Sequence, residues 1–304
     1  MIPDALCGPG IAVREDEPLA PRTTLRIGGP ARFLAEVSDA EALARVLRFA
    51  SAERLPVLVL GKGSNLLVPD AGFPGVVIVL GGSFRGTRVE GTEIVAGGGV
   101  SLMSLAVAAR DAGLSGVENV SGIPSSVGGA VRINAGSYGS EIFDVLVSVT
   151  LVSREGEVRT AAAEAITHGY RWTSLCESGD VVAEARFLLS EKSSVEVAAR
   201  MAEVAAKRRG ALPKQPNAGS IFKNPPGLFA GKLLEECRLK GRRAGGAEVS
   251  QVHANVIVNT GGATAEDVKR LMEEMKTGVR DRFGVELEPE IQMVGEERIS
   301  QKGE

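Results

Sequence analysis

The spacing of apolar residues predicts a series of amphipathic helices along the chain. In the segment 43–50 the apolar positions fall at i, i+3, i+4 and i+7, which indicates a helix over residues 39–53. Similar signals predict further helices over residues 101–111, 193–209, 229–237 and 264–283. The last of these opens with a capping box made by Thr264 and Asp267, and Gly210 is expected to end the helix that starts at residue 193.

Short apolar runs between glycine-rich turns predict strands in the rest of the chain. They are expected over residues 57–60, 76–80, 93–96, 145–153, 181–190, 253–259 and 285–294. Pro289 places the last strand at a sheet edge or a bulge, because proline cannot donate to a ladder. Residues 118–141 are rich in glycine, and we expect a long structured loop or a pair of tight turns there. A domain boundary is expected near residue 192, just before a helix.

Composition and charge remove several classes of protein. The 304 residues carry a net charge of −3, which argues against a nucleic-acid-binding protein whose affinity rests on positive charge. The three cysteines are odd in number and scattered, and the two histidines form no ligand pair, so we expect neither a disulfide framework nor a metal site. The N-terminus lacks a secretory signal, and the longest uncharged run, 94–109, is shorter than the roughly 20 apolar residues of a membrane span. We therefore expect a cytoplasmic protein that binds no membrane.

Residues 61–66 form a glycine loop directly after a predicted strand. The loop does not match the Rossmann fingerprint, because Leu66 stands where that pattern needs glycine, and it does not match a P-loop, because Gly63 follows the lysine. Its two glycines still allow backbone N–H groups to approach a phosphate, with Ser64 and Asn65 as further donors. A plain turn between two strands explains the same residues.

A second glycine loop runs over residues 121–130. Pro124 stiffens a turn there, and Gly128 and Gly129 leave room for a large group to lie close to the backbone. Two such loops in one domain, both poor in charge, suit a neutral or anionic dinucleotide that is held mainly by backbone donors.

The two glycine loops belong to a set of six motifs that occurs in a known order. The stretches are Thr23–Ala31, Gly61–Val68, Gly122–Ala130 with Asn134–Gly136, Tyr170–Arg171, Ala218–Pro225, and His253–Asn259 followed by Leu287–Ile291. Together they resemble the UDP-N-acetylenolpyruvoylglucosamine reductase family over about residues 20–296. The sequence departs from the family pattern at three positions. Ser125 replaces a usual glycine, Arg132 interrupts a usually apolar stretch, and Thr173 stands where a serine is common.

The resemblance implies an α+β fold with two domains. The first, residues 15–192, would be a two-lobed FAD-binding domain of the vanillyl-alcohol-oxidase type, and the second, residues 193–297, a smaller α+β substrate-binding domain. It also implies an enzyme of bacterial peptidoglycan precursor synthesis that holds FAD non-covalently. Such an enzyme uses NADPH as co-substrate to reduce the enolpyruvyl ether of UDP-N-acetylglucosamine enolpyruvate to UDP-N-acetylmuramate. The expected partner is this UDP-sugar, and no obligate protein partner is evident.

The same resemblance assigns residues to three roles. The expected FAD-binding residues are Gly61, Lys62, Gly63, Ser64, Asn65, Leu66, Gly122, Ile123, Pro124, Gly128, Gly129, Asn134 and Ala135. The expected substrate-binding residues are Tyr170, Lys223 and Asn224. The expected catalytic residues are Arg171, Ser220 and Glu290. Reduction of the enolpyruvyl group places negative charge next to a carboxylate, so a cation, a second polar group and a proton donor suit the reaction.

Each catalytic candidate also has an ordinary structural explanation. Arginines are mostly exposed, so Arg171 fits a surface position. Glu290 falls on the acidic side of the predicted C-terminal strand, and Ser220 fits a turn. Two other functions stay open at this point. One is an FAD-dependent sugar or lactone oxidase of the same flavoprotein superfamily, and the other is a non-catalytic module that binds a nucleotide sugar.

Overall fold

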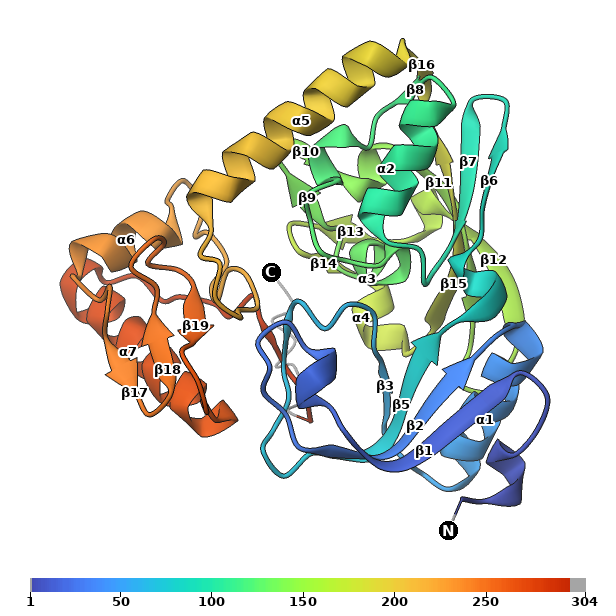
Figure 1. Cartoon of the computed structure of the whole chain (residues 1–304), viewed down its shortest axis with the longest axis horizontal. Helices are drawn as coiled ribbons and strands as arrows, with labels where there is room; N and C mark the ends of the chain where they lie inside the picture. Colours follow the sequence, from blue (N-terminus) through green and yellow to red (C-terminus); the bar gives the residue numbers. More distant parts are fainter. Residues whose placement is uncertain (1, 296–304) are drawn as a thin grey trace. The chain divides into compact units, whose positions relative to one another are not determined.

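A computed structural model describes residues 2–295 and divides them into two compact units (Figure 1). The first unit contains residues 2–17, 32–62 and 74–212, and the second contains residues 18–31, 63–73 and 213–295. Two short segments from the N-terminal part of the chain therefore belong to the second unit, together with the C-terminal segment from residue 213.

The first lobe of the first unit is a four-stranded sheet in the order β1-β2-β5-β3. The strands are β1 (Ile11–Pro18), β2 (Pro30–Val37), β5 (Phe73–Leu80) and β3 (Val57–Val59), and the helix is α1 (Ala40–Ala52). The carboxylate of Asp39 accepts a hydrogen bond from the Ala42 amide and so caps α1, which lies within the helix predicted over residues 39–53. The apolar face of α1 packs with residues of β2 and β5 in one buried cluster.

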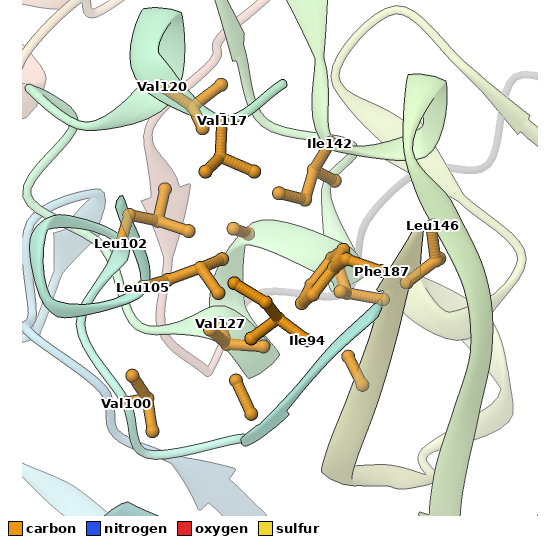
Figure 2. Packing of buried hydrophobic residues seen from close by; sticks show 14 of the residues in the cluster. Ile94, Val100, Leu102, Leu105, Val117, Val120, Val127, Ile142, Leu146 and Phe187 are labelled. Carbon is orange, nitrogen blue, oxygen red and sulfur yellow. The ribbon is translucent and has the colours of Figure 1, made fainter. Parts of the chain in front are cut away.

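The second lobe is a five-stranded antiparallel sheet in the order β12-β11-β15-β7-β6. The strands are β6 (Thr87–Glu90), β7 (Glu93–Gly97), β11 (Leu146–Val152), β12 (Val158–Ala162) and β15 (Val181–Leu188). Helices α2 (Leu102–Asp111) and α3 (Val127–Arg132) contribute to its core. Figure 2 shows this packing, in which Phe187 and Ile94, paired across β15 and β7, lie beside Val127 of α3.

Shorter elements complete the first unit. They are η1 (Asp4–Leu6), η3 (Gly82–Arg85), β8 (Leu114–Ser115), η4 (Glu118–Val120), β9 (Gly136–Ser137), β10 (Ser140–Glu141), η5 (Ile142–Asp144), η6 (Ala163–Ala165), β13 (His168–Gly169), β14 (Trp172–Thr173), α4 (Leu175–Ser178), β16 (Ser190–Glu191) and α5 (Ser194–Ala211). The pair β13 and β14 forms a hairpin whose two-residue turn is Tyr170–Arg171.

The second unit is a small α+β unit with its own core. Its elements are η2 (Ala20–Arg22), β4 (Leu66–Leu67), α6 (Ala230–Glu236), β17 (Arg243–Ala244), β18 (Ala247–Val249), β19 (Ile257–Asn259), α7 (Ala265–Phe283) and β20 (Gln292–Met293). The predicted capping box is present, with the Thr264 hydroxyl and the Asp267 carboxylate each accepting from the other's backbone. Asp70 also accepts hydrogen bonds from the first amides of α7, which ties segment 63–73 to this unit.

Four local predictions are wrong in detail. The glycine-rich stretch 118–141 is not only loop, because it contains α3 with Gly128 and Gly129 inside it. Helix α5 does not stop at Gly210 but continues to Ala211, where the approach of Pro213 forces Leu212 into an extended conformation. The remaining two concern the last pair of predicted strands.

Both of those strands are shorter than the apolar pattern suggests. Of residues 253–259 only β19 is strand, because the Asn255 amide donates to His253 Nδ1 and the Val256 amide to His253 O, which forms a turn in place of a ladder. Of residues 285–294 only β20 is strand, together with an isolated bridge at Pro289. The amides of Glu290 and Ile291 both donate to the same carbonyl of Ile221, so the chain bends instead of continuing a ladder.

The compact units divide at a different place from the predicted boundary at residue 192. The division falls between Leu212 and Pro213, so the whole of α5 groups with the first unit. Arg200 of α5 donates from Nε to Asn119 Oδ1 at 2.8 Å, and Val197 and Val204 are buried on the same helix. The predicted second domain also ended at residue 297, and residues 296 and 297 lie outside the described residues.

Adjacent residues of β15 provide a test of this core. Phe187 is 0% exposed, whereas Leu188 is 53% exposed on the opposite face of the strand. We expect Phe187→Ala to lower the free energy of unfolding by about 3–5 kcal/mol, because it leaves a cavity that the sheet and α3 cannot close. Leu188→Ala is the matched control and should change stability by no more than about 0.5 kcal/mol. Urea unfolding followed by circular dichroism measures both, and equal losses in the two variants would contradict this description of the core.

Candidate active site

The glycine loop at residues 121–130 is held against the loop between β7 and α2 by backbone hydrogen bonds. The Val127 amide donates to Val100 O at 2.8 Å and the Gly128 amide to Gly98 O at 2.9 Å, while Ser125 O accepts from the α2 backbone. A Cβ on Gly98 would lie 2.0 Å from Val182 O of β15, and one on Gly128 would lie 3.1 Å from both Gly98 O and Val182 O. Glycine is therefore required at position 98, and position 128 leaves little room for a side chain, because two stretches of backbone pack directly on the sheet.

Gly61, at the start of the first glycine loop, lies against the second loop. A Cβ at this position would be 2.5 Å from the Ser126 hydroxyl, so the two loops meet here within the first unit. Gly61, Lys62, Pro124 and Gly129 are exposed. Residues that were predicted to bind the same cofactor are thus brought together, and both loops present backbone to solvent.

The remainder of the first glycine loop belongs to the second unit. Gly63 adopts a φ of +60°, and a Cβ on it would lie 2.4 Å from Arg22 O, so this glycine serves local packing. The Asn65 amide donates from Nδ2 to Glu290 O at 3.1 Å, and Leu66 is paired with Gln292 in β4 and β20. The side chain of Asn65 thus holds the backbone that carries a predicted catalytic residue.

Gly122 faces the C-terminal end of α5. A Cβ at Gly122 would lie 2.4 Å from Cδ of Arg208, which crosses the loop at that point. Burial lowers the pKa of the Arg208 guanidinium, and Tyr138 partly offsets this effect. The adjacent Ile123 packs on the apolar core. These two predicted cofactor residues therefore also have structural roles.

Asn134 is fully buried, and its side-chain amide is engaged with protein. Nδ2 donates to Glu141 Oε2 at 2.7 Å and to Gly169 O at 3.2 Å, and Oδ1 accepts from the Phe143 amide at 3.3 Å. Neither the side chain nor the backbone of Asn134 is exposed, so the structure gives this predicted cofactor residue no surface toward a cofactor. Ala135, which follows it, is buried as well.

Arg171 occupies the turn of the β13–β14 hairpin with a φ of +58°. This left-handed backbone is uncommon for a residue other than glycine, and strain of this kind is concentrated at functional sites. Its guanidinium donates from Nη2 to Gly136 O at 2.8 Å and lies 4.8 Å from the ring centroid of Tyr170, which is exposed. The arginine is thus fixed at its backbone and at one guanidinium nitrogen.

The departures from the family pattern at residues 132 and 173 belong to the same cluster. The Thr173 hydroxyl donates to Arg132 O at 2.7 Å, so the threonine retains a hydrogen-bonding hydroxyl at this position. The Arg132 guanidinium donates to the carbonyls of Leu175 and Cys176 in α4. The hydroxyl of the third departure, Ser125, donates to Ser126 O at 3.0 Å. None of these three side chains needs a cofactor to satisfy it.

Ser220 and Glu290 lie on two segments of the second unit that are joined by a backbone hydrogen bond. Ser220 follows Gly219, whose φ is +74°, and precedes Ile221, whose carbonyl accepts from the Glu290 amide at 2.8 Å. Asn255, which is 3% exposed, exchanges two side-chain hydrogen bonds with the backbone of Phe222. The predicted proton donor and the predicted carboxylate are therefore set on neighbouring, tightly bonded segments.

Lys223 and Asn224, the predicted substrate-binding residues of this unit, both have protein partners. Lys223 forms an ion pair with Glu288 at 2.5 Å, and Glu288 is largely exposed. Asn224 Oδ1 accepts from the Ala230 amide at 3.1 Å and caps the start of α6. His253 is close to Gly231, and burial lowers its pKa, with Lys240 acting in the same direction. The lowered pKa favours the neutral imidazole, whose Nδ1 accepts a hydrogen bond from the Asn255 amide at 3.2 Å.

The sequence interpretation missed two features that hold the site. Gly97–Gly98–Gly99 supplies the backbone on which the second glycine loop rests, and three consecutive glycines after a predicted strand were the available signal. Asn255 lies in the motif His253–Asn259, but no role was predicted for it. An asparagine between apolar residues indicates a buried side chain that needs hydrogen-bond partners. Within residues 2–295, no group of histidine, cysteine, aspartate and glutamate side chains could hold a metal, and no helix is long and apolar enough to span a membrane.

The two glycine loops fit an FAD cofactor on chemical grounds. Gly61 and Gly129 expose backbone without a side chain, and the hydroxyls of Ser125 and Ser126 lie 3.2 and 3.3 Å from where a Cβ on Gly129 would be. The Gly129 amide donates to Ser126 Oγ at 3.3 Å and the Ser125 hydroxyl donates to Ser126 O at 3.0 Å, so the proton of the Ser126 hydroxyl is the donor of this loop that these bonds leave for a pyrophosphate. Lys62, which is exposed, adds a cation at the edge of the loops.

Comparison with known proteins agrees with this fit. A family model described as an FAD binding domain matches residues 31–162, and one described as the C-terminal domain of UDP-N-acetylenolpyruvoylglucosamine reductase matches residues 212–294. The fold and these matches define a flavoprotein oxidoreductase with an FAD-binding domain and a separate C-terminal domain.

Relatives and a solved structure identify the family within this class. Reductases of that name from Agathobacter rectalis and Symbiobacterium thermophilum are each 43% identical to this chain, covering 95% and 93% of it and 96% and 92% of their own lengths. The crystal structure of UDP-N-acetylenolpyruvylglucosamine reductase from Thermus caldophilus is similar, with a TM-score of 0.80, 40% identity, and coverage of 93% of this chain and 98% of that one. The chain belongs to the UDP-N-acetylenolpyruvoylglucosamine reductase family. It is an FAD-dependent oxidoreductase, so the oxidase and the non-catalytic module are not supported.

Gly129 gives the cleanest test of the flavin-binding face. Gly128 is packed against backbone, so enlarging it would disturb the protein itself, whereas Gly129 is exposed and meets only two hydroxyls. We expect Gly129→Leu to fold normally and to lose most of its flavin, because the side chain fills the space in front of the loops. Gly210→Leu is a matched control, since Gly210 also lies in a helix and has open space around its Cβ position. Flavin absorbance per protein and circular dichroism measure the outcome, and full flavin occupancy in Gly129→Leu would contradict the assignment.

Proposed function

We propose that this chain uses NADPH to reduce the enolpyruvyl ether of UDP-N-acetylglucosamine enolpyruvate. The product would be UDP-N-acetylmuramate, a precursor for peptidoglycan synthesis. The observation that carries the proposal is the combination of a glycine-loop face in the first unit, a strained arginine in the same unit, and a serine and a glutamate on bonded segments of the second. The match to the reductase family over more than nine tenths of the chain supports the substrate.

The glycine loops are proposed to hold the cofactor. Gly61, Lys62 and Gly129 are the exposed positions that would face it, and the Ser126 side chain packs against Gly61. When bound, FAD supplies the redox chemistry that carries electrons from NADPH to the enolpyruvyl group. The protein contributes binding, orientation and exclusion of water around that chemistry.

Arg171 is proposed to bind the carboxylate of the enolpyruvyl group. Reduction adds an electron pair to a carbon next to this carboxylate, and the negative charge spreads into it. A guanidinium fixed in place stabilises that charge more than a mobile one, because no reorganisation is needed during the reaction. The turn at Tyr170–Arg171 and the bond to Gly136 O provide this fixation. Tyr170 is proposed to contact the nucleotide sugar through its exposed ring.

Ser220 is proposed to donate the proton and Glu290 to interact with the charged intermediate. A serine in water is far too weak an acid for this task, so the proposal requires that the developing charge lies next to the hydroxyl. The Glu290 amide donates to the carbonyl of Ile221, the residue after Ser220. Lys223 and Asn224 follow Ser220 on its own segment. We propose that the last two bind the UDP portion of the substrate, with Lys223 exchanging its Glu288 partner for a phosphate.

The remaining expectations from the sequence are also part of the proposal. We propose that residues 15–192 form the FAD-binding domain and that residues 193–297 form the substrate-binding domain, as the sequence led us to expect. We further propose that the enzyme acts in the cytoplasm, without nucleic acid or an obligate protein partner. Cell fractionation with antibodies to the chain would test the location.

Anaerobic spectroscopy tests the proposed reaction. Purified protein should absorb near about 450 nm, lose this colour on addition of NADPH, and regain it on addition of the enolpyruvyl sugar, since the cofactor carries the redox chemistry. UDP-N-acetylglucosamine, which lacks the enolpyruvyl group, should not restore the colour. Recolouring only by oxygen would indicate an oxidase, and protein without colour would overturn the proposal.

Removing the Ser220 hydroxyl should slow only one of the two half-reactions. We expect Ser220→Ala to leave reduction of the flavin by NADPH near normal, because that step needs no proton from the protein. Reduction of the enolpyruvyl group should slow by about 10²- to 10⁴-fold, the usual cost of losing a positioned general acid. Thr260→Ala is a matched control in the same unit, because it also removes one hydroxyl. Rapid-mixing measurements separate the two steps, and equal slowing of both would show that Ser220 positions a loop instead of donating a proton.

A further inference from the structure

We propose that Asn134 is a positioning residue that sets the orientation of Arg171. This inference rests on the proposed role of Arg171 in binding the substrate carboxylate. Its basis is that a fully buried amide joins the segment 132–136, which follows α3, to the hairpin 168–173, whose turn carries the arginine. Figure 1 shows β13 and β14 of this hairpin beside α3.

The Asn134 side chain reaches the hairpin by two routes. Directly, Nδ2 donates to Gly169 O at 3.2 Å, and Gly169 is the last residue of β13 before the turn. Indirectly, Oδ1 accepts from the Phe143 amide, and the Phe143 ring stacks on His168 with centroids 4.2 Å apart. Both residues of β13 are therefore fixed by one asparagine.

Further hydrogen bonds join the same two segments on either side of Asn134. Before it, Arg132 O accepts from the Thr173 hydroxyl at 2.7 Å. After it, Gly136 O accepts from the Arg171 guanidinium at 2.8 Å. The segment 132–136 therefore contacts the hairpin at its base through Thr173, at β13 through Asn134 and at its turn through Arg171.

Backbone geometry explains why the position needs asparagine. Asn134 has a φ of +46°, a left-handed conformation that asparagine tolerates better than other residues with a side chain. Arg171, at the other side of the contact, has a φ of +58°. Arginine adopts this conformation less readily than glycine, and the amide of Asn134 supplies part of the restraint that holds Arg171 there.

The consequence for catalysis is specific. Without the Asn134 amide, Gly169 of β13 loses its hydrogen bond and Phe143, which stacks on His168, loses the acceptor of its backbone amide, so the turn can relax toward a less strained backbone that moves the guanidinium. A displacement of about 1 Å in a positioning group can cost about 10²-fold in rate. We therefore expect Asn134→Gly, which keeps the left-handed backbone but removes the amide, to slow reduction of the enolpyruvyl group by about 10²-fold. Reduction of the flavin by NADPH should not change.

A matched control is available in the same unit. Asn119 also makes three amide hydrogen bonds, to Tyr138 O, to the Ser140 hydroxyl and from Arg200 Nε, and none of them reaches the hairpin. Asn119→Gly should leave both half-reactions unchanged even if it lowers the thermal midpoint. Asn134→Asp keeps the size and the acceptor for the Phe143 amide but loses both donors, so it should slow the same half-reaction and provides a second variant if the glycine form folds poorly.

A double-mutant cycle with Arg171→Ala decides the question. If Asn134 acts through Arg171, the double variant should be as slow as Arg171→Ala alone, because nothing remains to be positioned. Multiplied effects, or slowing of both half-reactions by Asn134→Gly, would overturn the positioning role while leaving the role of Arg171 intact. A normal rate of enolpyruvyl reduction in Arg171→Ala would instead overturn the role of Arg171 itself, and with it this inference.

Discussion

The backbone pairing between the loop that follows β7 and the first residues of α3 is the constraint on which the rest of the site depends. Val127 and Gly128 donate to Val100 and Gly98 across this contact, and Gly98 in turn donates to Ala183 O of β15 at 2.7 Å. Two layers of backbone thus lie on the sheet with no side chain between them. A methyl group at residue 98 would collide with a carbonyl oxygen, so the arrangement exists only with glycine there.

Several functional features follow from this contact. It places Ser126 where Gly61 can approach its hydroxyl, so that two loops more than 60 residues apart in sequence share one face. It also fixes the start of α3, and this short helix ends directly before Asn134 and the hairpin of Arg171. One packing constraint therefore determines both where a cofactor can lie and how the arginine is held.

Much of the fold could be predicted from local patterns. The caps of α1, α2 and α7 and the positions of the strands β7, β11 and β15 follow from periodicity and from residues such as Asp39, Ser101 and Thr264. The prediction of a strand over residues 285–294 was wrong because the chain bends at Pro289, and the amides of the next two residues share the Ile221 carbonyl. The alternation of apolar residues does not reveal such a bend. Likewise, Gly128 and Gly129 lie inside a helix, and a glycine-rich sequence gives no local signal for that.

The candidate site was predictable only in part. Glycine pairs indicate close approach but not what approaches, and here Gly63 and Gly128 face protein whereas Gly61 and Gly129 face solvent. The roles of Asn65, Asn134 and Asn255 depend on partners distant in sequence, such as Glu290, Gly169 and Phe222, and no spacing rule encodes such contacts. The catalytic assignments came from family resemblance, because an arginine, a serine and a glutamate on separate elements carry no motif of their own.

A crystal structure of the chain with FAD tests the central claim most directly. The account predicts that the cofactor lies against the face formed by Gly61, Lys62 and Gly129, with the backbone pairing of Val127 and Gly128 unchanged. The Asn134 side chain should stay buried and away from the cofactor, because its amide remains bonded to Glu141 and Gly169. Flavin density that touches neither glycine loop, or an Asn134 side chain turned away from Gly169 toward the cofactor, would contradict the account.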